Sequence, residues 1–272
     1  MEFERKNSEL LAILFDLDNT LIATRKADAK ACKKLSQTLT EKYTIPLETS
    51  SQICNSYLKA FRECPDNPDM ELDTWREYLW SQALGDQYHT FSESIYQEWL
   101  NLRYHFLALT PEITVLLQNL RQHYFVGLIT NGPSNAQWEK VERLKLKSFF
   151  DIILVSGDLP WEKPHHKIFH EACDYLGVEP HHCIMVGDKL ETDILGGIKA
   201  QLGGTVWTPL NNCKLQETDP KPDFVIEYVT ELPSLLPRIK RVPGFRNNIV
   251  RGLNRFTVTD MDDCNSNSSD GS

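Results

Sequence analysis

The sequence lacks the features that are typical of secreted and membrane proteins. Its seven cysteines are an odd number, and they are scattered without any Cys-x-x-Cys pair. This argues against a disulfide framework or a zinc knuckle and favours a reducing compartment. The longest apolar runs, such as residues 10–15, are too short to span a bilayer, and the charged N-terminus has no apolar signal segment. We therefore expect a cytoplasmic protein.

Basic residues are also few. The 272 residues include 29 Lys and Arg against 38 Asp and Glu, which gives a formal net charge of −9. Such a chain has no general attraction for nucleic acid or for an anionic membrane, so we expect neither as a partner. An anionic substrate would then have to be bound by local charge, namely a metal ion, a lysine or backbone N–H groups.

Five short apolar runs recur along the chain. Continuous apolar runs of this length are typical of strands that are buried on both faces of a parallel sheet. They occupy residues 10–15, 124–129, 150–155, 183–186 and 204–207. From residue 110 onward they alternate with helical patterns, one of which opens with Thr110 and Pro111 and another of which covers 164–176. This alternation predicts an α/β fold with a doubly wound, Rossmann-like parallel sheet.

The stretch between the first two runs contains no convincing strand pattern. Four helical patterns fill it instead, at residues 25–43, 48–62, 72–84 and 92–106. We predict a catalytic core at 1–23 and 108–240, with an inserted all-helical cap at 24–107. A cap placed there can act as a lid over a site at the strand ends. Residues 241–272 begin as a basic segment and end rich in Ser and Asp, a composition that predicts a disordered tail.

The strongest chemical signal follows the first apolar run. Asp16 and Asp18 stand at the carboxyl end of that strand, which is where parallel α/β sheets bind ligands. Alternation along an extended chain puts both carboxylates on the same side. Two like charges buried together are unfavourable unless a cation joins them, and Mg²⁺ prefers oxygen ligands of this kind. A lone Asp-x-Asp is also typical of turns and helix caps.

Three further polar elements follow later strands. Thr130 and Asn131 come after the second run, Lys163 after the third, and Asp188 with Asp193 after the fourth. A threonine hydroxyl and a lysine can bind phosphate oxygens, and the two acids can complete a metal site. Taken singly, each element has an ordinary interpretation: an Asn-Gly turn, a surface lysine or acidic helix caps.

Together, the four elements resemble the motifs of the haloacid dehalogenase superfamily over roughly residues 10–235. The resemblance implies an inserted helical cap and a Mg²⁺ cofactor. It also implies that Asp16 is the nucleophile and that Asp18 is the general acid and base. By the same resemblance, phosphate is bound by Thr130, Asn131 and Lys163. The metal is held by the carboxylates of Asp16 and Asp188 and the backbone carbonyl of Asp18, with Asp193 in a supporting position beside it. Because Asp18 is a carboxylate, the resemblance is to phosphatases rather than to dehalogenases, since a departing alkoxide needs a proton donor.

A narrower resemblance concerns the substrate. Residues 14–22, 161–164 and 184–194 resemble the phosphatases that act on N-acylneuraminate 9-phosphate, a phosphorylated sugar acid. An arginine of the cap could hold the carboxylate of such a substrate in a bidentate pair. Arg103 is our first candidate and Arg62 and Arg25 are alternatives; the other interpretation of each is a solvated helix position.

Other functions remain open from the sequence. They are a phosphatase for another small ester such as phosphoglycolate, a sugar phosphomutase, and a non-catalytic binding protein on the same fold. Four converging charges speak against the last, because a pure scaffold has no physical need for them. We expect the chain to be a monomer.

Overall fold

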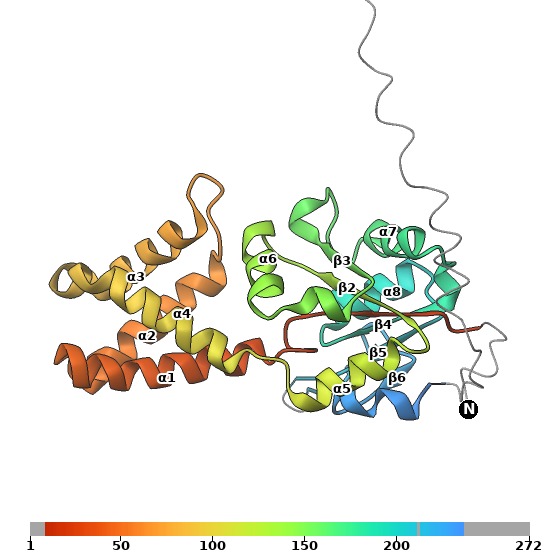
Figure 1. Ribbon diagram of the computed structural model, residues 1–272, viewed down its shortest axis with the longest axis horizontal. Coiled ribbons are helices and arrows are strands. Elements are labelled where there is room, and N and C mark those ends of the chain that lie inside the picture. Colours follow the sequence, from red (N-terminus) through yellow and green to blue (C-terminus); the bar gives the residue numbers. More distant parts are fainter. Residues whose placement is uncertain (1–8, 211–212, 237–272) are drawn as a thin grey trace, which may run out of the picture. The chain divides into compact units, whose positions relative to one another are not determined.

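The computed structural model describes residues 9–210 and 213–236 (Figure 1). The tail predicted at 241–272 lies outside the described residues. No helix in this part of the chain combines the length and the apolar character needed to cross a membrane.

A six-stranded sheet forms the centre of the core. All of its pairings are parallel, and the strand order is β3-β2-β1-β4-β5-β6. The strands are β1 Ala12–Phe15, β2 Phe125–Thr130, β3 Ile152–Val155, β4 Cys183–Gly187, β5 Gly204–Trp207 and β6 Phe224–Val225. The predicted doubly wound sheet is confirmed. Each of the five apolar runs contributes a strand, whereas the two residues of β6 were too short a signal to be predicted.

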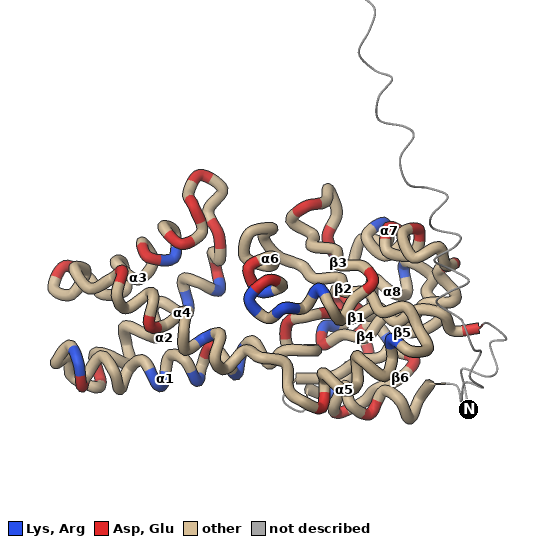
Figure 2. Tube along the Cα trace, viewed as in Figure 1, with Lys and Arg blue, Asp and Glu red and all other residues tan. Residues whose placement is uncertain are grey.

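Burial explains why these segments are strands. They carry no Lys, Arg, Asp or Glu, as the tan strands of Figure 2 show. Every residue of β1 is fully buried, with helices of the core packed over the sheet. An uncharged apolar segment with both faces covered is what a central parallel strand requires.

The helices of the core lie on both sides of the sheet (Figure 1). They are α5 Pro111–Leu120, α6 Ser134–Arg143, α7 His166–Leu176 and the short α8 Leu195–Lys199. Thr110 caps α5 as expected, since its hydroxyl accepts a hydrogen bond from the N–H of Ile113 at 3.3 Å. Helix α7 begins at His166 rather than at Pro164, because the ring of His165 accepts from the N–H of Lys167 and takes the capping position.

Four helices form the cap, with a hydrophobic core of their own. They are α1 Thr24–Tyr43, α2 Leu47–Glu63, α3 Leu72–Tyr88 and α4 Ser92–Phe106. Trp80 and Trp99 are fully buried there, and the ring of Tyr57 stacks on that of Trp80 with the centroids 3.8 Å apart. The helical cap predicted after the first strand is therefore present. Its exact limits at 24 and 107 stay a prediction.

The register of the sheet brings several strand ends to one edge. Phe15, the last residue of β1, pairs with Leu128 of β2 and with Val186 of β4. Residues that follow these strands therefore emerge side by side. The chain order reverses between β1 and β4, and such a switch point is where open α/β sheets bind ligands.

Candidate active site

The side chain of Asp16 lies at this edge, bound to a lysine from the loop after β3. Lys163 Nζ donates to Asp16 Oδ1 at 2.7 Å, and it also pairs with Asp193 Oδ1 at 2.8 Å. The hydroxyl of Thr20 donates to the other oxygen of Asp16 at 3.0 Å. Lys163 is 2% exposed, so its charge is held in the protein interior between two acids. Burial would lower the pKa of Lys163, but Asp16 and Asp193 outweigh it and raise this pKa above its usual value.

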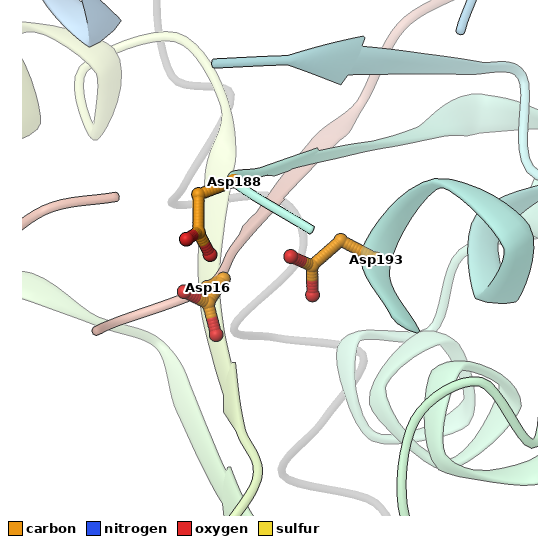
Figure 3. Close-up of side chains that lie close together, drawn as sticks. All are labelled: Asp16, Asp188 and Asp193. Carbon is orange, nitrogen blue, oxygen red and sulfur yellow. The ribbon is translucent and has the colours of Figure 1, made fainter. Parts of the chain in front are cut away.

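Three carboxylates surround the same point. Oxygens of Asp16, Asp188 and Asp193 lie within 4.8 Å of one another, and all three residues are buried. Figure 3 shows that the carboxylates of Asp188 and Asp193 are directed toward Asp16. Burial and the charge of Asp16 and Asp193 raise the pKa of Asp188 to about 7. Burial likewise raises the pKa of Asp16 to about 6, even though Lys163 opposes that rise.

A cation fits this arrangement of acids. Asp188 Oδ1 is buried and has no hydrogen-bond partner among the residues that the structure describes. An unpaired buried carboxylate oxygen is costly, and the raised pKa values express the same crowding of negative charge. A divalent ion would relieve both, since carboxylate oxygens are the ligands that hard cations prefer. The cluster can therefore bind a metal ion.

Glycine at position 187 makes the cluster possible. A Cβ atom there would lie 2.3 Å from Asp193 Oδ2, far inside any real contact. The same oxygen accepts a hydrogen bond from the N–H of Lys189 at 3.0 Å, which fixes the carboxylate against the strand end. Gly187, the last residue of β4, thus lets Asp193 reach Lys163.

Asp18 faces a different set of partners. Lys140 Nζ lies 2.8 and 2.7 Å from its two oxygens, and Gln137 Nε2 donates to Oδ2 at 3.1 Å. The hydroxyl of Thr24, the first residue of α1, donates to Oδ1. Burial would raise the pKa of Asp18, but the charge and hydrogen bonds of Lys140, with those of Thr24 and Gln137, lower it to about 2. Asp18 is ionised at neutral pH in this arrangement.

Lys140 and Gln137 were not predicted as site residues from the sequence. Both are on α6, and they are 6% and 5% exposed. The available signal was their spacing. They share the i, i+3, i+4 stripe of Ala136 and Val141, which predicts the buried face of a helix. Polar residues on such a stripe need buried partners, and here the partner is Asp18.

The predicted phosphate-binding residues Thr130 and Asn131 are placed differently. Thr130 ends β2, and its buried hydroxyl has no hydrogen-bond partner within the described ranges. The amide of Asn131 is already occupied: it donates to the carbonyl of Lys163 at 2.8 Å and accepts from the N–H of Lys163 at 2.9 Å. The side chain of Asn131 therefore holds the Lys163 backbone in place, and phosphate contact through it stays a prediction.

The predicted substrate arginine, Arg103, lies inside the cap. It is 1% exposed, and its Nε donates to Asp28 at 2.8 Å. Its guanidinium also lies 5.1 Å from the ring centre of Phe61. The alternative interpretation of Arg103 as a solvated helix position is wrong, because an acid of α1 and aromatic rings of the cap enclose the charge. Substrate contact by Arg103 stays a prediction.

One of the alternatives, Arg25, shares a cavity with an acid of the site. It borders a cavity of about 470 Å³ that also reaches Asp188. Lys189, Glu191 and Lys214 belong to the same lining, so charges of both signs meet there.

Known proteins resemble this chain along most of its length. Residues 13–205 match the model of the haloacid dehalogenase-like hydrolases. The N-acylneuraminate-9-phosphatase of Homo sapiens is 36% identical over 238 residues, which cover 85% of this chain and 96% of that protein. The glyceraldehyde 3-phosphate phosphatase of Pyrococcus furiosus is 32% identical over 241 residues, with 85% and 94% covered.

Solved structures of hydrolases are also similar to this chain. The HAD-hydrolase YfnB of Bacillus subtilis, bound to magnesium, is 26% identical, with a TM-score of 0.58 over 84% of this chain and 99% of its own. A HAD phosphatase of Thermococcus onnurineus is 25% identical, with a TM-score of 0.57 over 83% and 97%. The chain therefore belongs to the haloacid dehalogenase-like hydrolase family and is a phosphatase of that family.

Proposed function

We propose that the chain is a Mg²⁺-dependent phosphomonoesterase that forms an aspartyl-phosphate on Asp16 and prefers a phosphorylated sugar acid, N-acylneuraminate 9-phosphate. The observation that carries the chemistry is the buried cluster of Asp16, Lys163, Asp188 and Asp193 at the sheet edge. A nucleophile there is held in place by Lys163 and Thr20, so it needs no large rearrangement to attack phosphorus.

In the first half of the reaction, an oxygen of Asp16 attacks the phosphorus in line with the ester oxygen. The bond from Asp16 to phosphorus forms as the ester bond breaks, and the leaving oxygen takes a proton from Asp18. Asp18 must acquire that proton beforehand, because its contacts with Lys140 favour the ionised form. Lys163 offsets negative charge on the transferring group, and the free hydroxyl of Thr130 can donate to one of its oxygens.

In the second half, water attacks the phosphorus of the aspartyl-phosphate and Asp16 departs as a carboxylate. The ionised Asp18 takes a proton from that water, which returns the site to its starting state. The low pKa of Asp18 beside Lys140 supports this step, because it favours the ionised form that accepts the proton.

The proposed metal ion is Mg²⁺, held by the carboxylates of Asp16 and Asp188 and the backbone carbonyl of Asp18. When bound, it supplies positive charge that stabilises the negative phosphoryl oxygens. The all-oxygen donor set and the unpaired Asp188 Oδ1 support this ion.

The substrate proposal is supported by the N-acylneuraminate-9-phosphatases of human, rat and mouse, which are 35–36% identical over 85% of this chain. In the proposed mechanism the core motifs bind only the phosphate group, so selectivity has to come from the cap and from residues around the site. A sugar acid needs a cation for its carboxylate. Arg103 is the partner proposed from the sequence, and Arg25 lines the same cavity as Asp188. The six cysteines of the described part are free thiols, which supports a proposed cytoplasmic location.

A phosphate-release panel tests the proposal. We expect kcat/KM for N-acetylneuraminate 9-phosphate to exceed that for phosphoglycolate and glucose 6-phosphate by at least about tenfold, which needs only ~1.4 kcal/mol of differential transition-state binding. Hydrolysis that does not depend on Mg²⁺ would contradict the metal proposal. A preference for phosphoglycolate would overturn the sugar-acid substrate and leave the phosphatase in place.

A second candidate substrate has a specific observation in its favour. The Pyrococcus furiosus relative, 32% identical, is named for glyceraldehyde 3-phosphate. Glyceraldehyde 3-phosphate therefore belongs in the same panel. A higher kcat/KM for it than for N-acetylneuraminate 9-phosphate would favour a small-ester phosphatase.

A further inference from the structure

Helix α6 carries a buried lysine whose hydrogen bonds are all directed to the site. Lys140 Nζ contacts both oxygens of Asp18 at 2.8 and 2.7 Å and Gln137 Oε1 at 3.3 Å. An ammonium group has three donors, so these contacts account for all of them. Lys140 is 6% exposed, and its three contacts are with the carboxylate of Asp18 and with Gln137, a second partner of that carboxylate.

Gln137 completes the arrangement one helical turn earlier. Its Nε2 donates to Asp18 Oδ2 at 3.1 Å and to the carbonyl of Asn131 at 3.0 Å, while its Oε1 accepts from Lys140. The glutamine therefore ties the loop after β2 to the same carboxylate. Asp18 receives donors from two positions of one helix and cannot turn without breaking several hydrogen bonds.

A contribution to stability does not by itself explain why polar residues are buried at positions 137 and 140. A buried ion pair seldom stabilises more than apolar side chains of the same size, because desolvation offsets the attraction. The stripe of α6 that faces the core would accept apolar residues at both positions, as it does at Ala136 and Val141. What the polar pair adds is a fixed place for a carboxylate that has to meet the leaving oxygen.

The helix itself is anchored on a neighbouring face. Glu139 accepts from Arg76 of α3 and from Arg143 of α6. Acidic and basic positions adjoin along this helix in Figure 2. The segment that presents Lys140 and Gln137 is thereby held on both sides.

Resting on the proposed function, we propose that Lys140 and Gln137 are positioning residues for Asp18: they hold its carboxylate where it exchanges a proton with the leaving oxygen and then with water. They act through Asp18 and need not touch the substrate. Their contribution should be large when the leaving group needs a proton and small when it does not.

The dependence on the leaving group can be tested, because a purely structural role would lower the activity on both kinds of ester equally. We compare Lys140→Met with the wild-type enzyme on two esters: p-nitrophenyl phosphate, whose leaving group needs little protonation, and the alkyl phosphate that the wild type hydrolyses best. The readout is kcat/KM, which reports the steps up to departure of the leaving group. Because general acid catalysis contributes about 10²–10⁴-fold, we expect a loss of at least ~30-fold on the alkyl ester and under about threefold on p-nitrophenyl phosphate.

Two further variants act as controls. Lys140→Arg keeps the charge and the donors. The logarithm of its kcat/KM on the alkyl ester should therefore recover by at least about a third of the drop seen in Lys140→Met. Lys147→Met removes a lysine that is 61% exposed and paired with Glu142, and it should change neither ester. Equal losses on both esters, or no loss in Lys140→Met, would overturn the proposal.

Gln137→Leu provides a second measurement if Lys140→Met does not fold. It leaves Lys140 in place and removes one donor to Asp18, so the same leaving-group pattern should appear with a smaller loss. Equal loss on both esters, or none, again overturns the proposal. A wild-type enzyme that hydrolyses neither ester would instead contradict the proposed function itself.

Discussion

The strand-end site and the cap interior both bury charged side chains, but they balance them differently. At the sheet edge, Asp16, Asp188 and Asp193 surround the single ammonium of Lys163. Three buried acids share one buried cation there. The raised pKa values of Asp16 and Asp188 are the consequence of that surplus.

In the cap, each buried arginine has an acid. Arg103 pairs with Asp28 inside the cap, and Arg76 of α3 pairs with Glu139 of α6. A balanced pair can serve to hold helices together, whereas a surplus of buried charge calls for a ligand of the opposite sign. The comparison separates a structural use of buried charge from a functional one.

The largest effect should come from changing the strand-end site, where buried acids outnumber the buried cation. Asp16→Asn replaces the proposed nucleophile with a poor one, and we expect turnover to fall by about 10⁴-fold or more, the range seen when nucleophiles are removed. Steady-state phosphate release checks this. Asp174→Asn, at an exposed position of α7, is the matched control and should leave turnover unchanged. Substantial activity in Asp16→Asn would show that another group attacks phosphorus.

The balanced cap pair should respond as a structural element. Arg103→Ala leaves Asp28 buried without its partner, and we expect the free energy of unfolding to fall by about 3–5 kcal/mol. The double variant Asp28→Leu/Arg103→Met, which removes both charges, should recover most of that loss. Urea unfolding of the three proteins checks both values.

The same variants address substrate contact. If the double variant is stable and keeps its preference for N-acetylneuraminate 9-phosphate over a generic ester, Arg103 does not hold the carboxylate. Loss of that preference in a stable double variant would place Arg103 in substrate binding.

A smaller effect should follow from crowding the site. Gly187→Ala puts a Cβ atom 2.3 Å from Asp193 Oδ2, so Asp193 and its partner Lys163 must move. Because a misplacement of about 1 Å can cost ~10²-fold, we expect kcat to fall by about 10–100-fold. Gly177→Ala, where an added Cβ meets nothing within 4 Å, should cost stability through its positive φ and leave kcat unchanged. Unaltered kcat in Gly187→Ala would mean that the place of Asp193 is immaterial.

The smallest effect concerns pH. The pKa values of Asp16 and Asp188 are raised to about 6 and 7, above an ordinary value of 3.8. Between those values the unfolded chain releases protons that the folded chain keeps. In the metal-free protein, the contribution of Asp16 and Asp188 to the free energy of unfolding is therefore fully present below about pH 4. It is lost as the pH rises through about 7.

Mg²⁺ should oppose that loss, because it binds the ionised carboxylates. We expect it to raise Tm by at least ~3 °C more at pH 8 than at pH 5. Thermal melts with and without Mg²⁺ at the two pH values measure this, and Asp188→Asn should reduce the difference. An equal Mg²⁺ effect at both pH values would contradict a site made of these acids.

The strands and the polar residues at their ends could be predicted because they leave a simple pattern in the sequence. Five apolar runs became buried parallel strands, and the polar residues that follow them emerge at one edge. Strand ends in a parallel sheet are brought together by the fold itself, so chain order is enough to predict their meeting.

Partners across the fold leave no such pattern. The burial of Arg103 depends on Asp28, 75 residues away, and Lys140 meets Asp18 across 122 residues. A charged residue in a helical segment is interpreted as solvent-exposed, because nothing nearby in the sequence indicates its partner. Asn131, which the family resemblance assigns to phosphate binding, also has a partner that is distant in the sequence, since its amide binds the backbone of Lys163.

The central claim is a covalent phosphoenzyme on Asp16, and trapping it is the most direct test. The enzyme is mixed with its preferred phosphate ester and Mg²⁺, quenched in acid within one turnover and reduced with borohydride, which converts an aspartyl-phosphate to homoserine. Peptide mass spectrometry then locates the change. We predict homoserine at position 16 in the wild type and none in Asp16→Asn. Turnover by the wild type with position 16 unmodified, or modification at another residue, would contradict the account.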